Sequence, residues 1–263
     1  MKIELPTRYD IGYPKRNIKY YSTYGKRKLV KKLYASCNGY CMYCGKTVRV
    51  DGDKNFHLEH SVDKKGNIHQ EIDSNNVLEH CKFNLAIACE KCNTVCKKVV
   101  DKVDLINYEP LLKCSPKCEK MCEPYSKIRA EYMRKNAIIL QPKGIQDPIP
   151  YLISYDLLKH IYVPEGVDEQ DEVLFFIQNH IDRFELNGER FSTCIIDLCS
   201  KLVCWYENGI KDINSLLDAL NNENHSNILG EKFTSFIKEY YLEKTAKKLI
   251  DFCRLLVILD AVS

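Results

Sequence analysis

Two Cys-x-x-Cys pairs, with an acid–histidine pair between them, are the residues of this chain best suited to chemistry. The first pair is Cys41 and Cys44, and the second pair is Cys89 and Cys92. A structural zinc site takes four ligands in a tetrahedron, usually thiolates or imidazoles. A two-residue spacer allows both sulfurs of one pair to reach the same ion. The spacing therefore predicts a structural Zn²⁺ bound by four cysteines.

Two other uses of cysteine fit this chain less well. A redox dithiol is expected within a βαβ pattern, and no such pattern surrounds the two pairs. A disulfide scaffold is typical of small secreted domains, whereas this chain has 263 residues and starts Met-Lys-Ile-Glu-Leu-Pro, without the apolar core of a signal peptide. Because no apolar run reaches about 18 residues, we expect a cytoplasmic protein without a membrane span.

The segment from the first cysteine pair to just past the second carries side chains that suit phosphodiester hydrolysis. That reaction needs a base to deprotonate water and a positive charge beside the leaving oxygen. His60 suits the base because histidine titrates near neutrality, while Glu59 and Asn93 offer the oxygen ligands that Mg²⁺ prefers. Neighbouring residues of a strand point to opposite faces, so Glu59 and His60 share a site only if it wraps around the strand end. Asn84 is expected to orient His60, either through the imidazole ring or by fixing the local loop.

The same residues resemble the HNH nuclease family with zinc knuckles, over residues 33–98. The matching residues are Cys41, Cys44, Leu58, Glu59, His60, Asn84, Leu85, Cys89, Cys92, Asn93 and Lys97. In that family a ββα-metal unit, made of a strand pair and one helix, holds one catalytic divalent ion. The resemblance implies that Glu59 and Asn93 bind Mg²⁺ or Mn²⁺, and that His60 activates water while Asn84 positions it. The sequence departs from the family in having Glu59 where Asp is commoner and in lacking the proline often found after the histidine.

A broader layout resembles the HNH subunit of Septu-type and retron-associated anti-phage systems. It comprises the asparagine–cysteine core together with residues 136–142 and 177–187. In those systems the HNH subunit works with an ABC-type or AAA-like ATPase, so the resemblance implies an anti-phage nuclease effector with an ATPase protein partner. Two alternatives stay open, namely a non-catalytic zinc-knuckle adaptor that binds nucleic acid or protein, and a stand-alone restriction-type nuclease.

Charge is distributed unevenly along the chain. Residues 1–50 carry 12 Lys and Arg against 2 Asp and Glu, whereas residues 151–263 carry 11 against 19. A basic arm that also holds tyrosines can neutralise phosphates and stack on bases, although such runs are also common on solvated helix faces. We expect the arm to bind DNA or RNA and the acidic half to dock a different partner. The cations expected to contact nucleic acid are Lys15, Arg16, Lys19, Lys26, Arg27 and Lys28.

Apolar spacing and turn residues predict an α+β fold with a mostly α-helical C-terminal region. A helix is expected over residues 26–37 and a strand over residues 56–62, and the prolines and glycine of residues 142–150 predict a boundary. Further helices are expected over residues 172–184, 190–206, 211–222 and 231–262, the last dividing near Glu243. The expected regions are a basic arm and helix (1–36), a zinc-knuckle HNH domain with a cysteine-rich extension (37–141), and an acidic helical domain for docking or regulation (151–263).

Several other residues have two interpretations. His57 shares a strand face with Glu59, and it either adds a metal ligand or supports one from behind. Cys114, Cys118 and Cys122 follow one another at four-residue spacing, and they form either a second zinc site or a set of half-buried thiols. Four cysteines among apolar helical residues are expected in the core, namely Cys194, Cys199, Cys204 and Cys253.

Overall fold

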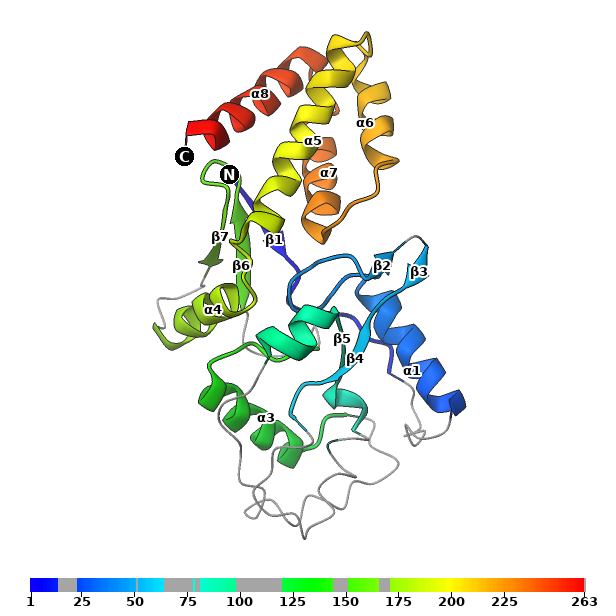
Figure 1. Cartoon of the computed structure of the whole chain (residues 1–263), viewed down its shortest axis with the longest axis vertical. Helices are drawn as coiled ribbons and strands as arrows, with labels where there is room; N and C mark the ends of the chain where they lie inside the picture. Colours follow the sequence, from blue (N-terminus) through cyan, green and yellow to red (C-terminus); the bar gives the residue numbers. More distant parts are fainter. Residues whose placement is uncertain are drawn as a thin grey trace.

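The chain folds into short antiparallel strands and longer helices, which agrees with the mixed fold class expected from the sequence. The computed structural model describes residues 1–13, 23–50, 52–63, 78, 81–97, 120–143, 151–165 and 171–262. Along the long axis of the molecule, a three-stranded sheet lies between a helical half and a half that contains the cysteine pairs (Figure 1). Within the described ranges, no helix has both the length and the apolar character needed to cross a membrane.

The helical half follows the apolar periodicity of the sequence closely. It consists of α5 (Glu189–Glu207), α6 (Ile213–Asn221), α7 (Ile228–Tyr241) and α8 (Ala246–Val262). The helix α4 (Asp171–Arg183) precedes them in the chain. The predicted helical stretches are confirmed, and the break near Glu243 falls between α7 and α8. Cys194, Cys199 and Cys253 are buried as expected, Cys199 and Cys253 where α5 packs along α8, and Cys194 where α5 packs near the start of α7. Cys204 is exposed, which corrects its placement in the core, because it lies on the solvent-facing side of α5.

A three-stranded antiparallel sheet joins the start of the chain to the region after residue 150. Its strand order is β1 (Lys2–Leu5), β6 (Leu152–Asp156) and β7 (Ile161–Glu165). Ile3 and Leu5 are buried, and α7 packs against β1. The sequence did not predict β6 and β7, because each covers only five residues and too few alternations to stand out from a helical pattern.

The other half is built around a second pair of strands. Its elements are α1 (Thr23–Ser36), β2 (Arg49–Val50), β3 (Asp53–Lys54), β4 (His57–His60), β5 (Leu85–Ala88) and α3 (Glu123–Asn136). The helix and the strand predicted for residues 26–37 and 56–62 correspond to α1 and β4. β4 pairs antiparallel with β5, placing Glu59 opposite Ala86. Leu33 of α1 is buried where this helix packs against β5.

The two halves meet where the turn after Cys44 touches the loop before α7. Asn227 is buried there, and its Nδ2 donates a hydrogen bond to the Cys44 carbonyl oxygen (3.2 Å) while its Oδ1 caps α7 by accepting from Leu229 N (2.9 Å). Ile228 N donates to the Gly45 carbonyl oxygen (2.8 Å). Gly45 has φ +72°, and a Cβ at this position would lie 2.6 Å from the Ile228 side chain. Only glycine therefore permits this approach.

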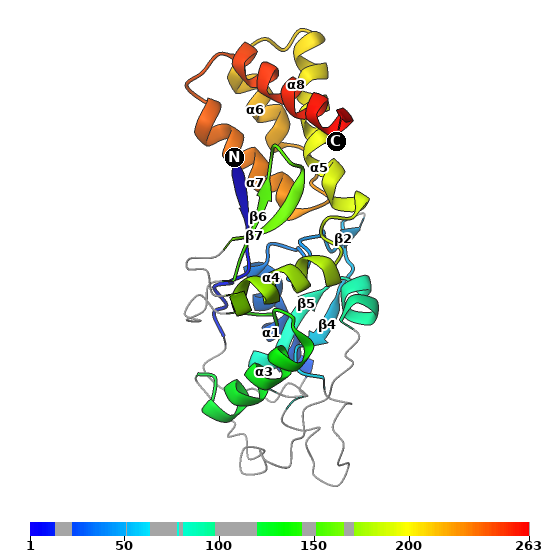
Figure 2. The same cartoon turned by 90° about the vertical axis from the view of Figure 1, so that its left-hand side faces the viewer.

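His180 fastens α4 to the turn of the first cysteine pair. Figure 2 shows α4 between the three-stranded sheet and the β4–β5 pair. His180 Nε2 lies 2.9 Å from the Tyr43 carbonyl oxygen, and the imidazole packs against the rings of Tyr43 and Phe184. Burial lowers the pKa of His180 to about 4, so the ring is neutral in the folded chain at neutral pH.

This buried histidine predicts a loss of stability in mild acid. The unfolded chain binds a proton at an ordinary histidine pKa of about 6.5, whereas folded His180 does so only near pH 4. The histidine's contribution to stability is therefore complete above pH 6.5 and is lost as the pH falls toward 4. Linkage gives a loss of about 2 kcal/mol between pH 7 and pH 5.

The measurement is urea unfolding of zinc-loaded protein at both pH values. His180→Gln keeps a neutral donor, so its unfolding free energy should fall by about 2 kcal/mol less than that of wild type over the same interval. Parallel decreases in the two proteins would show that His180 is not the titrating group.

Candidate metal centre

Four cysteine sulfurs gather in one buried cluster. The Sγ atoms of Cys41, Cys44, Cys89 and Cys92 all lie within 4.8 Å of one another. Cys44 Sγ and Cys89 Sγ are 3.9 Å apart. Zn–S bonds of ~2.3 Å in a tetrahedron place the sulfurs roughly 3.8 Å from one another. The predicted convergence of the two pairs is confirmed, and the cluster has the size to hold a structural metal ion such as zinc.

Each cysteine pair is shaped by the backbone that follows it. Gly45 N donates to the Cys41 carbonyl oxygen (2.9 Å), and Asn93 N donates to the Cys89 carbonyl oxygen (3.1 Å). These two turns bring both sulfurs of each pair to the same side of the chain. Cys92 of the second pair is the first residue of the π-helical turn Cys92–Cys96. A metal ion bound by the sulfurs would therefore also fix the start of that turn.

The protonation of the cluster depends on the ion that it binds. Contacts with the sulfurs of Cys41 and Cys89, followed by burial, raise the pKa of the Cys44 thiol. Four buried thiolates are stable together only beside a cation, because their charges otherwise repel in a medium of low polarity. Metal binding at this cluster therefore releases protons and weakens in acid.

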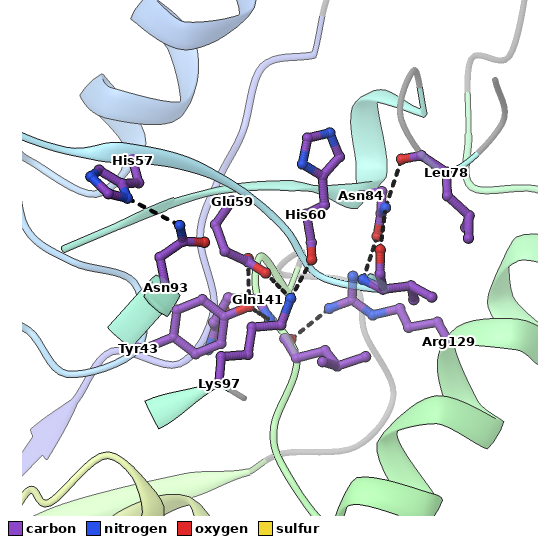
Figure 3. A network of polar contacts seen from close by, with 12 residues as sticks. Tyr43, His57, Glu59, His60, Leu78, Asn84, Asn93, Lys97, Arg129 and Gln141 are labelled. Atoms are coloured by element: carbon purple, nitrogen blue, oxygen red, sulfur yellow. Dashed lines mark hydrogen bonds and ion pairs between the residues drawn. The ribbon is translucent and has the colours of Figure 1, made fainter. Parts of the chain in front are cut away.

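A row of polar side chains lies where β4 faces the π-helical turn. Asn93 Nδ2 lies 3.0 Å from His57 Nδ1. One turn further on, Lys97 Nζ donates to Glu59 Oε1, and the Tyr43 hydroxyl donates to Glu59 Oε2 (2.8 Å). The spacing of His57 and Glu59 along the strand thus matches the spacing of Asn93 and Lys97 along the helical turn. Each of the two strand side chains therefore contacts one partner on that turn (Figure 3).

The Glu59–Lys97 ion pair is almost completely removed from solvent. The Lys97 side chain is 6% exposed and the Glu59 side chain is 1% exposed. Burial, and then the Arg129 guanidinium, lower the pKa of Lys97, whereas the adjacent carboxylate favours the charged ammonium. Lys97 also donates to the His60 carbonyl oxygen. The Glu59 carboxylate is therefore neutralised by the protein's own cation.

His60 and Glu59 point away from each other. In Figure 3 the His60 ring lies on the opposite side of β4 from the Glu59 carboxylate, as the alternation of a strand requires. The ring is partly exposed at the last position of β4. A single site that uses both side chains must therefore reach around the end of the strand.

Asn84 fixes the loop that follows β4. It is fully buried, and its Nδ2 donates to the carbonyl oxygens of Val62 (3.0 Å) and Leu78 (2.7 Å). Its Oδ1 accepts from Val62 N (2.7 Å) and from the Tyr125 hydroxyl (2.7 Å). Of the two roles considered for Asn84, these contacts favour fixing the loop over direct contact with the His60 ring.

Two residues of this region were not anticipated from the sequence. Tyr43 lies inside the first Cys-x-x-Cys pair and sends its hydroxyl to Glu59. Arg129 of α3 is buried and donates to the carbonyl oxygens of Leu140 (2.6 Å) and Pro142 (2.8 Å). The position of Tyr43 between two ligand cysteines could have indicated its role from the sequence. No local sequence pattern indicated the role of Arg129.

Several predicted residues fall elsewhere. Lys15, Arg16 and Lys19 lie outside the described residues, as do Cys114 and Cys118 and the side chain of Lys26. Arg27 and Lys28 are exposed on α1, and Cys122 is partly exposed just before α3.

Comparison with known proteins adds no relative. No family model, no curated protein and no solved structure matches this chain. The chemistry of the centre is therefore argued from its own residues.

The cysteine cluster predicts one zinc ion per chain, which Cys44→Ser should largely lose because a serine hydroxyl is a poor substitute for a thiolate. Zinc is measured by elemental analysis after gel filtration at pH 7.5. Cys204→Ser changes an exposed cysteine and should retain the metal. Equal zinc in wild type and Cys44→Ser would contradict the site.

Breaking the buried ion pair should be costly. Lys97→Met leaves the Glu59 carboxylate buried without its cation, and we expect the free energy of unfolding to fall by about 3 kcal/mol. The double variant Glu59→Gln, Lys97→Met removes both charges and should recover more than half of that loss. Urea unfolding of zinc-loaded protein measures both, with exposed Lys238→Met as the control. A cost within that of the control would show that the pair is not formed.

Proposed function

We propose that this chain is a divalent-metal-dependent endonuclease of the HNH type, which hydrolyses phosphodiester bonds in nucleic acid. The observation that most supports the proposal is the alignment of side chains between β4 and the π-helical turn. The row includes a carboxylate, Glu59, and an amide, Asn93, and the second cysteine pair fixes the start of the turn that carries Asn93. Their oxygens are the ligand type that Mg²⁺ and Mn²⁺ prefer.

In this proposal Glu59 and Asn93 hold Mg²⁺ or Mn²⁺, with His57 beside them. When bound, such an ion stabilises negative charge on the leaving oxygen. His60, partly exposed at the end of β4, deprotonates the attacking water. Lys97 competes with the metal for Glu59. The burial that lowers the pKa of Lys97 makes it easier for the ammonium to lose its proton and release the carboxylate.

The proposed substrate and partner follow from the two ends of the chain. Arg27 and Lys28 present cations on α1 for DNA or RNA. The acidic C-terminal half offers α5–α8 as a docking unit for an ATPase partner in an anti-phage system, in keeping with the layout of residues 136–142 and 177–187. Co-purification of the natively expressed chain tests for this partner, and isolation without an ATPase favours a stand-alone restriction-type nuclease.

A non-catalytic adaptor is the second candidate, and one observation favours it. Glu59 is fully satisfied by Lys97 and Tyr43, so the carboxylate needs no metal. Titration of the zinc-loaded chain with Mn²⁺ separates the two candidates. Binding of one Mn²⁺ that is lost in Glu59→Gln supports the nuclease, whereas no binding supports the adaptor.

The test of catalysis is a cleavage assay with Mg²⁺ or Mn²⁺ on single-stranded DNA, duplex DNA and structured RNA. Loss of a general base typically costs about 100-fold or more in rate, and we expect this loss in His60→Ala. The variant must keep its zinc content and its unfolding midpoint. Lys238→Ala, an exposed change on α7, should cut like wild type. Equal rates for wild type and His60→Ala on every substrate would remove His60 from the mechanism.

A further inference from the structure

A polar cavity of about 880 Å³ lies outside the candidate metal centre. It is formed between the segment around the first cysteine pair and the region of α6 and α7. Tyr40, Thr47 and Arg49 line one wall, and the loop after α6 together with the start of α7 lines the other. Both walls consist mainly of hydroxyl, amide and charged side chains. The volume falls within the range of small-molecule sites, roughly 300–1,000 Å³.

Two opposite charges in this cavity are held apart by a neutral residue. Arg49 Nε donates to the Tyr34 hydroxyl (3.0 Å), and its Nη2 donates to the Asn38 carbonyl oxygen (3.3 Å). Glu231 accepts from Asn38 Nδ2 at 2.8 and 3.1 Å. In the part of the chain that the structure describes, neither charge forms an ion pair. Each charge is thus oriented by neutral groups and keeps bonding capacity for a ligand.

The backbone makes room for this arrangement. Gly39 has φ +75°, and a Cβ at this position would lie 2.6 Å from Arg49 Nε and 2.8 Å from the Tyr34 hydroxyl. A residue with a side chain would displace the guanidinium and strain the turn. Gly39 thus leaves room for the guanidinium to lie against the Tyr34 hydroxyl.

The wall chemistry selects one class of ligand. A single guanidinium suits one phosphate group, whereas Glu231 in the same cavity, which has no ion-pair partner among the described residues, disfavours a polyphosphate. A carboxylate accepts hydrogen bonds from neighbouring hydroxyl groups, and the amides of Asn221 and Asn224 can pair with a base or a sugar. Apolar ligands are disfavoured because most of the accessible wall surface is polar.

We propose that this cavity binds a ribose monophosphate, with the phosphate on Arg49 and the ribose hydroxyls on Glu231. Two sources share this chemistry, a free mononucleotide and the 5′-phosphorylated end of a strand. Because Thr47 and Arg49 line the cavity together with Ser226 and Glu231, a bound ligand also braces the junction between the two halves of the chain.

The test is calorimetric titration of full-length, zinc-loaded protein. The probes are the four ribonucleoside 5′-monophosphates, their 2′-deoxy forms, ribose 5-phosphate, 5′-phosphorylated trinucleotides and inorganic phosphate. We expect at least one ribose monophosphate to bind with Kd below about 1 mM. Binding by the mononucleotides alone identifies a free nucleotide as the ligand, and binding by the trinucleotides alone identifies a strand end.

Matched variants make the outcome decisive. Arg49→Gln should weaken binding at least tenfold, and Glu231→Gln should abolish the preference for ribose over 2′-deoxyribose. Lys54→Gln removes a cation that sits 4.5 Å from the Tyr34 ring but does not line the cavity, and it should bind like wild type. The proposal is overturned if no ribose monophosphate binds at millimolar concentration, if phosphate alone binds as tightly, or if folded Arg49→Gln binds unchanged.

Discussion

Closure of the four cysteines on one point is the constraint on which the rest of this structure depends. Cys44 and Cys89 are 45 residues apart in sequence but have adjacent sulfurs. The β4–β5 pair within that span has only four residues in each strand, too few to be stable alone in water. A metal ion at the cluster would offset the entropy of closing so long a segment. The same turn, through Gly45 and Cys44, is also the contact for Asn227 and the helical half.

The buried Glu59–Lys97 pair acts on a finer scale. Removing two charges from water is unfavourable unless their geometry and remaining hydrogen bonds are well satisfied, and here Tyr43 and the His60 carbonyl oxygen complete the set. A shift of β4 by one residue would turn Glu59 to the other face and leave Lys97 buried alone. The pair therefore selects one register of β4 against the helical turn. Lys97 and a metal ion would also compete for the same carboxylate. In the nuclease proposal Glu59 binds the metal ion, whereas in the adaptor proposal it stays paired with Lys97.

How much was predictable depended on how local the signal was. The cysteine pairs and the helices α4–α8 follow short-range spacing, and both were predicted. The pairing of β1 with β6 joins residues far apart in sequence, and no local pattern encodes it. Glu59 and Lys97 both belonged to the motif, but their ion pair was not predicted, because packing and not spacing brings the two side chains together. Asn84 was expected to orient His60, and its buried contacts with Val62 and Leu78 show that it fixes the loop after β4.

The pairing of β1 with β6 also bears on how the chain is made. β1 is synthesised before the other described elements, but its partner strand is synthesised only after the whole of the cysteine-containing half. Cys92, the last sulfur of the cluster, emerges well before β6 begins at Leu152. Metal capture can therefore precede completion of the sheet, and the compact metal-bound segment brings the two distant strands closer together. The order of synthesis thus allows the four cysteines to converge before β1 pairs with β6.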